Sequence, residues 1–250
     1  MPKHVAVIGA GPAGLATAKS LQEHDIKATI LERGNQLGGL WVPNRSPMWD
    51  TMRTNISRYT CSFSDLQHTA DTSLFPLVAE MNRYLNAYAK EFSLPEHINL
   101  RSNVKGIRPK NGGWSVSTEE NGRPVADQHF DGIAISSGFF SKGVIPQIKG
   151  RDNFKGIILH SQDYLSAHEF TGLHVVVVGN GLSGVEIASD ICTQAASVTH
   201  LTKRPSWILP RMLPDPNSTQ DIPLDLLFYR RGPLAINLQR TQSEINRWKK

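Results

Sequence analysis

Two glycine-rich turns of the form GxGxxG could each hold the pyrophosphate of a dinucleotide. The first turn, which follows the apolar run 5–8, is Gly9-Ala10-Gly11-Pro12-Ala13-Gly14. The second turn, which follows the valines at 175–178, is Gly179-Asn180-Gly181-Leu182-Ser183-Gly184. Glycines let the backbone approach the phosphates. Backbone N–H groups and the N-terminus of a helix then bind the negative charge of these phosphates. The chain is therefore predicted to bind two dinucleotides, and an enzyme with two usually passes electrons between them.

The residues that follow the next strand indicate which dinucleotide each turn takes. Glu32 stands 23 residues beyond Gly9, where a carboxylate accepts hydrogen bonds from ribose hydroxyls and repels a 2′-phosphate. Thr202 stands 23 residues beyond Gly179 and is followed by Lys203 and Arg204. These cations suit the 2′-phosphate of NADP, and a guanidinium can bind it in a bidentate manner. The pair of patterns predicts FAD at the first turn and NADPH at the second.

Two β-α-β units are needed to position these residues. Residues 1–32 predict the first unit with a helix from about 12 to 23, and residues 173–202 predict the second with a helix from about 182 to 195. A further helix is expected over 77–92. An apolar strand over 132–138 ends in small residues, as expected where a strand meets a bound cofactor. The fold class is α/β with two Rossmann-like dinucleotide-binding units.

Composition excludes several other classes of function. The net charge is +5, but the basic residues are scattered without interleaved aromatic residues, so we expect no nucleic-acid partner. No run of eighteen apolar residues predicts a membrane span, and the first strand begins too early for a signal peptide. A cytoplasmic location is expected, or attachment to a membrane through something outside this chain. Cys61 and Cys192 form no CxxC pair, which weakens the alternative of a flavin-dependent disulfide reductase. No HExxH spacing occurs, and no metal site is expected.

A segment between the two units carries a family resemblance. The run from Phe154 to Tyr164, with Gly156 and His160 inside it, resembles the FxGxxxHxxx(Y/F) motif of flavin-containing monooxygenases. The related Baeyer–Villiger enzymes have Trp at the last position, so Tyr164 favours the flavin-containing monooxygenase branch. The resemblance implies that Phe154 and Tyr164 pack this hinge down. It gives His160 an architectural or NADP-positioning role rather than one in acid–base catalysis.

Other segments resemble the same family, and the resemblance covers about residues 4–230. Gly38-Gly39-Leu40-Trp41 is similar to its GGxW loop, which approaches FAD. Thr54-Asn55-Ile56 is similar to the stretch that places an Asn beside flavin and nicotinamide, and this makes Asn55 the candidate catalytic residue. A carboxamide can both donate and accept hydrogen bonds there. Ser183-Gly184-Val185-Glu186 is expected to meet the NADP pyrophosphate, while Arg33 and Gly138 are expected at the FAD site.

The resemblance implies an NADPH-dependent flavin monooxygenase that uses O₂ to oxygenate a small sulfur or nitrogen nucleophile through a C4a-hydroperoxyflavin. Residues 1–150 would form the N-terminal part of the FAD-binding domain, and residues 151–250 an inserted NADPH-binding domain. Family members run to well over 400 residues, so the C-terminal return to the FAD domain is absent here. Three explanations of this short length stay open: the chain is a fragment, a partner chain supplies the remainder, or the chain is a truncated product. A homodimer is also possible. The alternatives in function are a Baeyer–Villiger ketone monooxygenase and a non-catalytic dinucleotide-binding module.

Overall fold

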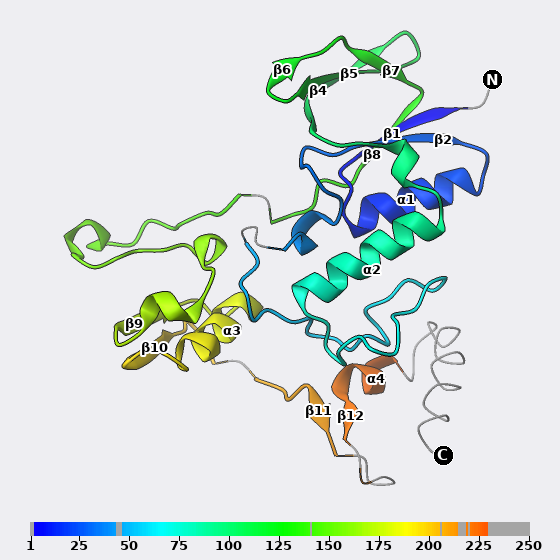
Figure 1. Ribbon diagram of the computed structural model, residues 1–250. Helices are drawn as coiled ribbons and strands as arrows, with labels where there is room; N and C mark the ends of the chain where they lie inside the picture. Colours follow the sequence, from blue (N-terminus) through cyan, green and yellow to red (C-terminus); the bar gives the residue numbers. More distant parts are fainter. Residues whose placement is uncertain are drawn as a thin grey trace. The chain divides into compact units, whose positions relative to one another are not determined.

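The computed structural model describes residues 3–43, 47–140, 142–205, 207–214, 219 and 221–229 (Figure 1). The chain forms two compact units that are each discontinuous in sequence. The first unit contains Met1–Trp49 and Met81–Leu165, and the second contains Asp50–Glu80 and Ser166–Lys250. These units are defined by packing. The assignment of cofactors to domains 1–150 and 151–250 stays a prediction.

A parallel sheet forms the centre of the first unit, with strands in the order β3-β2-β1-β8. The strands are β1 (His4–Ile8), β2 (Lys27–Leu31), β3 (Ile98–Asn99) and β8 (Gly132–Ile135). Helix α1 (Pro12–Gln22) connects β1 to β2, which confirms the first predicted β-α-β unit. Ala6, Val7, Leu15 and Ile30 are fully buried, and Ala6 packs with Leu31, Val116 and Phe130 on the face of the sheet opposite to that of Val7 and Ile30. The continuous apolar run 5–8 therefore forms a strand that is covered on both faces and leads into the first turn.

An antiparallel sheet and a second helix complete the first unit (Figure 1). Its strands are β4 (Ser102–Lys110), β5 (Gly113–Glu120), β6 (Arg123–Pro124) and β7 (Gln128–Phe130). Asn111 and Gly112, with φ of 48° and 77°, form the two-residue turn between β4 and β5, as Asn-Gly favours. Residues 81–91 of helix α2 (Val78–Glu91) belong to this unit. Short 3₁₀ helices span Gly39–Trp41, Pro95–His97, Arg151–Asn153 and Ser161–Asp163.

The second unit contains the second predicted β-α-β arrangement. Strands β9 (His174–Val178) and β10 (Ser197–Leu201) pair in parallel, with α3 (Leu182–Ile191) between them in sequence. The predicted extension of this helix to 195 is wrong. The Thr193 hydroxyl donates to the Asp190 carbonyl, which also accepts the Thr193 N–H in an i→i+3 bond that ends the helix. A 3₁₀ helix at Ala167–Phe170 precedes β9.

Beyond β10, two short strands and one helix are described. Strands β11 (Met212–Leu213) and β12 (Ile222–Pro223) pair in an antiparallel manner, and α4 (Leu224–Tyr229) follows. The chain beyond α4 lies outside the described residues. None of the helices in the described ranges is long and apolar enough to cross a membrane.

Candidate dinucleotide-binding site

The first turn is a cradle that only glycine can build. Gly9 has a φ of +104°, and a Cβ there would lie 2.6 Å from the Ser136 carbonyl oxygen. A Cβ on Gly14 would lie 1.9 Å from the carbonyl oxygen of Gly9. Gly11 is the N-cap of α1, Pro12 begins the helix without an N–H group, and the N–H groups of Ala13 and Gly14 have no partner within the helix. This end of α1 is therefore suited to a pyrophosphate.

The GGxW loop packs directly against the first turn. A Cβ on Gly39 would lie 3.0 Å from the Cα of Gly11, and the Gly38 N–H donates to the Ala10 carbonyl. Leu40 and Trp41, which follow in the same 3₁₀ helix, are partly buried. The Asn82 amide of α2 donates to the Leu37 carbonyl at 3.2 Å and so holds this loop from the other side. The loop therefore lies against the first turn, and its approach to FAD stays a prediction.

Glu32 has a role that the sequence did not reveal. Its side chain is buried, and its two oxygens accept the N–H groups of Ala10 at 2.8 Å and Gly34 at 2.7 Å. The carboxylate therefore holds the first turn in place. Each oxygen keeps a second lone pair, so a ribose hydroxyl can still donate to Glu32. Arg33 is exposed and lines a surface cavity of about 590 Å³ together with Arg101 and Asn103.

The second turn repeats the backbone geometry of the first. Gly179 has a φ of +121°, and a Cβ on Gly184 would lie 2.3 Å from its carbonyl oxygen. The Gly179 N–H donates to the Leu201 carbonyl, and the His200 Nε2 lies 2.6 Å from the Gly179 carbonyl oxygen. Gly181 is the N-cap of α3. Ser183, Gly184, Val185 and Glu186 form the first turns of this helix, with Ser183 exposed.

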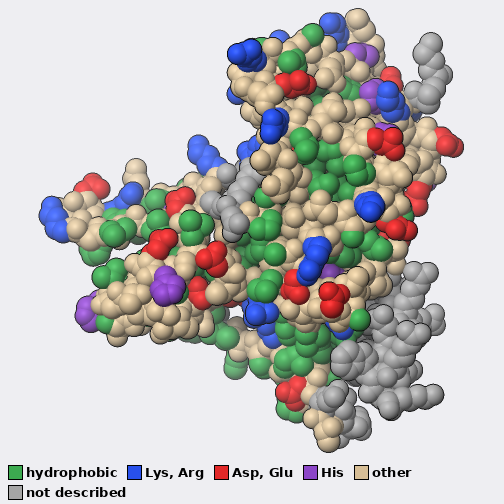
Figure 2. Space-filling view, viewed as in Figure 1, with side chains coloured by type: hydrophobic (Ala, Val, Ile, Leu, Met, Phe, Trp, Pro, Cys, Tyr) green, Lys and Arg blue, Asp and Glu red, His purple; other side chains and the backbone are tan. Residues whose placement is uncertain are grey.

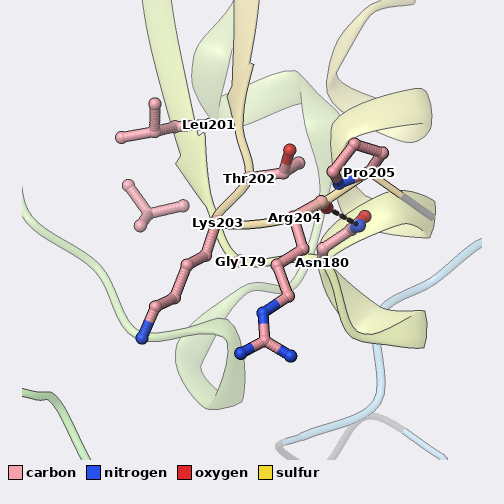
Figure 3. Close-up of a pocket in the computed structure, with 8 residues that line it drawn as sticks. Gly179, Asn180, Leu201, Thr202, Lys203, Arg204 and Pro205 are labelled. Carbon is pink, nitrogen blue, oxygen red and sulfur yellow. Dashed lines mark hydrogen bonds between the residues drawn. The ribbon is translucent and has the colours of Figure 1, made fainter.

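An open pocket of about 580 Å³ adjoins the second turn (Figure 3). It is lined by the end of β9, the turn and the end of β10, namely by Val178, Gly179, Asn180, Leu201, Thr202, Lys203, Arg204 and Pro205. Figure 3 shows the side chains of Lys203 and Arg204 extending to the same side of the pocket. The Asn180 amide donates to the Arg204 carbonyl at 3.2 Å and ties this loop to the turn. Among the described residues, no carboxylate lies within salt-bridge distance of either cation.

Asn55 lies in a hydrogen-bonded loop of the second unit. The adjacent Thr54 is buried, its N–H donates to the Pro76 carbonyl, and its hydroxyl donates to the Ile56 carbonyl at 2.7 Å. Asn55 itself is exposed, and its Oδ1 accepts a hydrogen bond from Arg211 at 3.3 Å. The structure therefore brings Asn55 to a residue that sequence reasoning assigned no role. Nothing in the spacing of Arg211 marks it, because 156 residues separate the two.

The residues of the FxGxxxHxxx(Y/F) segment do not all pack as expected. Tyr164 is buried against Trp49, with ring centroids 6.1 Å apart, but Phe154 is 61% exposed, so the expectation that both aromatic residues pack is wrong for Phe154. His160 caps the 3₁₀ helix Ser161–Asp163, since its Nδ1 accepts the Gln162 N–H at 3.0 Å. This contact is consistent with an architectural role. Gly138 is exposed with a φ of +76°.

A buried polar cluster in the second unit surrounds Cys61. The Asp225 carboxylate accepts hydrogen bonds from the hydroxyls of Ser57 at 2.7 Å and Thr60 at 2.5 Å. Burial, with a smaller contribution from the charge of Asp225, raises the pKa of the Cys61 thiol to about 11. Burial also lowers the pKa of the nearby His68. Cys61 therefore stays a neutral thiol at physiological pH and is a poor nucleophile.

Comparison with known proteins decides the family. Residues 2–249 match the family described as flavin-binding monooxygenase-like. The chain belongs to this family. Among curated relatives of this flavin-binding monooxygenase-like chain, flavin-containing monooxygenase 5 of Oryctolagus cuniculus is 32% identical over 242 residues, which cover 92% of this chain and 44% of the relative. Flavin-containing monooxygenase FMO GS-OX3 of Arabidopsis thaliana is 32% identical over 227 residues, 81% of this chain and 49% of the relative.

Solved structures agree with the family. The structure of S-allyl-L-cysteine S-oxygenase from Allium sativum aligns with a TM-score of 0.76 and 26% identity, over 88% of this chain and 55% of that one. A crystal structure of OTEMO in complex with FAD and NADP shares the fold at a TM-score of 0.66 and 24% identity, over 84% of this chain and 41% of that one. The predicted family and the mixed α/β fold with parallel sheets are confirmed. This member of the family spans about half the length of the curated relatives it matches.

The residues present fit the dinucleotides that the family implies. Both turns have the positive-φ glycine and the close helix–strand approach that a pyrophosphate cradle requires. A buried carboxylate follows the first, and two exposed cations follow the second. The assignment of each individual site residue to FAD or NADP stays a prediction.

Proposed function

We propose that this chain binds FAD at the first turn and NADPH at the second and serves as a flavin-dependent monooxygenase for small sulfur or nitrogen nucleophiles. One observation carries the proposal. Two cradles of the same backbone geometry are followed by opposite charges, Glu32 after one and Lys203 with Arg204 after the other. A carboxylate disfavours a 2′-phosphate, whereas the two cations attract it, so the two turns select different dinucleotides.

On the FAD side, the proposal uses residues of the first unit. The N–H groups at the start of α1 would bind the pyrophosphate, and Glu32 would accept a ribose hydroxyl with the lone pairs that Ala10 and Gly34 leave open. Gly39, Leu40 and Trp41 would border the cofactor from the loop that contacts Gly11. Arg33 and Gly138, both exposed, would lie at the margin of this site.

On the NADPH side, the proposal uses residues of the second unit, and the NADP-positioning role of His160, which lies in the first unit, stays a prediction. The start of α3, from Gly181 through Ser183 to Val185, would bind the pyrophosphate. Lys203 and Arg204, whose side chains extend to one side of the pocket in Figure 3, would bind the 2′-phosphate. Glu186 already pairs with Arg211 at 2.6 Å, so we propose that it holds that cation rather than binding the nucleotide directly.

The chemistry of oxygenation belongs to the cofactor. When bound, FAD that has been reduced by NADPH supplies the activation of O₂. The residues of this chain would bind and orient the two nucleotides, and the Asn55 carboxamide would supply a hydrogen bond to the reacting groups. The neutral Cys61 thiol takes no part, in agreement with a reaction that needs no protein nucleophile. The relative from Allium sativum is described as an S-oxygenase, which supports sulfur compounds as the first substrates to test.

The test is product analysis with the purified chain, FAD, NADPH and O₂. A simple thioether and a cyclic ketone are offered together. Formation of the sulfoxide with matching NADPH consumption is expected. Formation of the lactone alone would assign the chain to Baeyer–Villiger chemistry instead. Binding of NADPH without any flavin-dependent NADPH oxidation would contradict the enzyme proposal and favour a non-catalytic dinucleotide-binding module.

A further inference from the structure

Arg211, which immediately precedes β11, joins three segments of the second unit that are distant in sequence. Its guanidinium donates to the Asn55 Oδ1 at 3.3 Å and to the Glu186 Oε1 at 2.6 Å. The guanidinium carbon also lies 5.7 Å from the centroid of the Phe75 ring. The Arg211 side chain is 39% exposed and that of Glu186 is 22% exposed, so the ion pair is partly shielded from water. One cation therefore connects the Asn55 loop to the helix that follows the second turn.

The contact determines which face of the Asn55 carboxamide is offered to a ligand. A guanidinium has donors only, so the amide atom that faces Arg211 must be the oxygen. The Asn55 NH₂ group then points away from Arg211 within the amide plane. Without Arg211, the two flipped orientations of the Asn55 amide would differ little in energy. Asn55 could then present either its oxygen or its nitrogen to a ligand.

Arg211 is itself held in place. Glu186 lies in the first turns of α3, and the neighbouring Val185 N–H is bonded to the Gly181 carbonyl at 3.1 Å. The carboxylate that orients Arg211 is therefore anchored on the same helix that we assign to NADPH. The Phe75 ring lies beside the guanidinium as a further support.

We propose that Arg211 is a positioning residue that fixes the Asn55 carboxamide with its NH₂ group turned toward the ligand. This proposal rests on the proposed function, which gives Asn55 its catalytic role. Asn55 then acts as a hydrogen-bond donor, and only the second lone pair of its oxygen remains for other partners. Glu186 contributes by holding the guanidinium rather than by touching the cofactor.

The first experiment uses the cofactor-free chain, labelled with ¹⁵N at asparagine, and follows the side-chain amide resonances of Asn55 by NMR. The Asn55→Ala variant assigns them. Arg211→Met should shift the pair toward the values of a freely rotating amide, and Arg211→Lys should shift it less. The matched control is Thr51→Val, because the Thr51 hydroxyl also joins this loop to α3, through the Asp190 Oδ1 at 2.8 Å, without touching Asn55. Unchanged resonances in Arg211→Met, or equal shifts in Thr51→Val, would overturn the proposal.

The second experiment measures the hydrogen peroxide released per NADPH oxidised in the chain loaded with FAD. Asn55→Ala and Arg211→Met should each raise this ratio several-fold, whereas Thr51→Val should leave it unchanged. The double variant should release no more peroxide than Asn55→Ala alone, because Arg211 acts only through Asn55. Additive effects would show that Arg211 acts elsewhere.

The two experiments separate the failure of this inference from the failure of the proposed function. If Asn55→Ala leaves peroxide release unchanged, the catalytic role of Asn55 fails, and the NMR result still decides whether Arg211 orients the amide. If Asn55→Ala raises the ratio and Arg211→Met does not, the role of Asn55 stands and the positioning role of Arg211 is wrong. Partial restoration of Arg211→Met by added guanidinium ion would further support the contact.

Discussion

The two glycine-rich turns have the same backbone and different surroundings. In the first, β1 pairs with β2 on one side and β8 on the other, and the Ser136 carbonyl lies where a Gly9 Cβ would be. In the second, β9 pairs only with β10 among the described strands, and no atom lies within 4 Å of the corresponding point on Gly179. Glu32 is buried beneath the first turn, whereas Lys203 and Arg204 stand exposed beside the second.

This difference separates what the motif encodes from what its neighbours add. The GxGxxG pattern is sufficient for the positive φ and the close helix approach, which are present in both turns. The enclosure of the first turn comes from β8 and Ser136, which lie far from it in sequence. The second turn, which is less enclosed, also has exposed apolar side chains on the strands beside it. Val176, Val178 and Leu201 on β9 and β10 are 57–61% exposed, and Figure 2 shows hydrophobic side chains at the surface.

The largest expected effect is a loss of stability when the first glycine of each turn is replaced by alanine. Gly9→Ala combines a strained positive φ with a backbone clash, each worth about 1–3 kcal/mol, so the first unit should lose about 2–6 kcal/mol of stability. Gly179→Ala carries only the strain, and the second unit should lose about 1–3 kcal/mol. Hydrogen exchange resolved by peptide measures each unit separately. Equal losses would show that the packing around Gly9 adds nothing.

A smaller effect concerns the charge that follows the second turn. Arg204→Ala should weaken NADPH binding by about 1.5–3 kcal/mol, through loss of a charged hydrogen-bond partner, and leave NADH binding nearly unchanged. Calorimetric titration with both nucleotides measures this. The control is Arg151→Ala, which removes a cation from the first unit. Equal weakening of NADPH and NADH would show that Arg204 does not bind the 2′-phosphate.

The corresponding test of the first turn is Glu32→Gln. The amide can replace one acceptor oxygen, but its NH₂ group then faces a backbone N–H, so the first unit should lose about 1–3 kcal/mol. FAD affinity should fall with it, and NADPH affinity should not change. Glu119→Gln, at a partly exposed carboxylate paired with Lys105, is the control. Unaltered stability in Glu32→Gln would mean that its bonds to Ala10 and Gly34 do not hold the turn.

The smallest expected effect is a pH dependence of the first unit. Burial, followed by the charge of Lys27, lowers the pKa of His4 below its ordinary value of 6.5, while Asp131 partly opposes the shift. The unfolded chain then binds more protons, so the first unit should lose stability as the pH falls below about 6.5. His4→Gln should flatten this dependence in a denaturation series from pH 7.5 to pH 5, and the exposed His24 supplies the control variant. An unchanged slope in His4→Gln would assign the effect to other groups.

Local features were predictable from the sequence, and distant contacts were not. The turns, the β-α-β units and the positions of Glu32 and Arg204 follow from glycine spacing and apolar runs. The hydrogen bond from Ala10 to Glu32 and the bond from Arg211 to Asn55 depend on how separate segments pack, which spacing does not encode. The exposure of Phe154 was missed for the same reason, because a motif position does not show whether a partner surface covers it.

The most direct test of the central claim is an anaerobic titration of the chain followed by visible absorption. The chain is incubated with FAD, desalted, and then given NADPH or NADH in steps. The account predicts a retained flavin band of about one FAD per chain, bleached by NADPH at much lower concentration than by NADH. A folded chain that loses FAD on desalting, or whose flavin stays oxidised in excess NADPH, would contradict it.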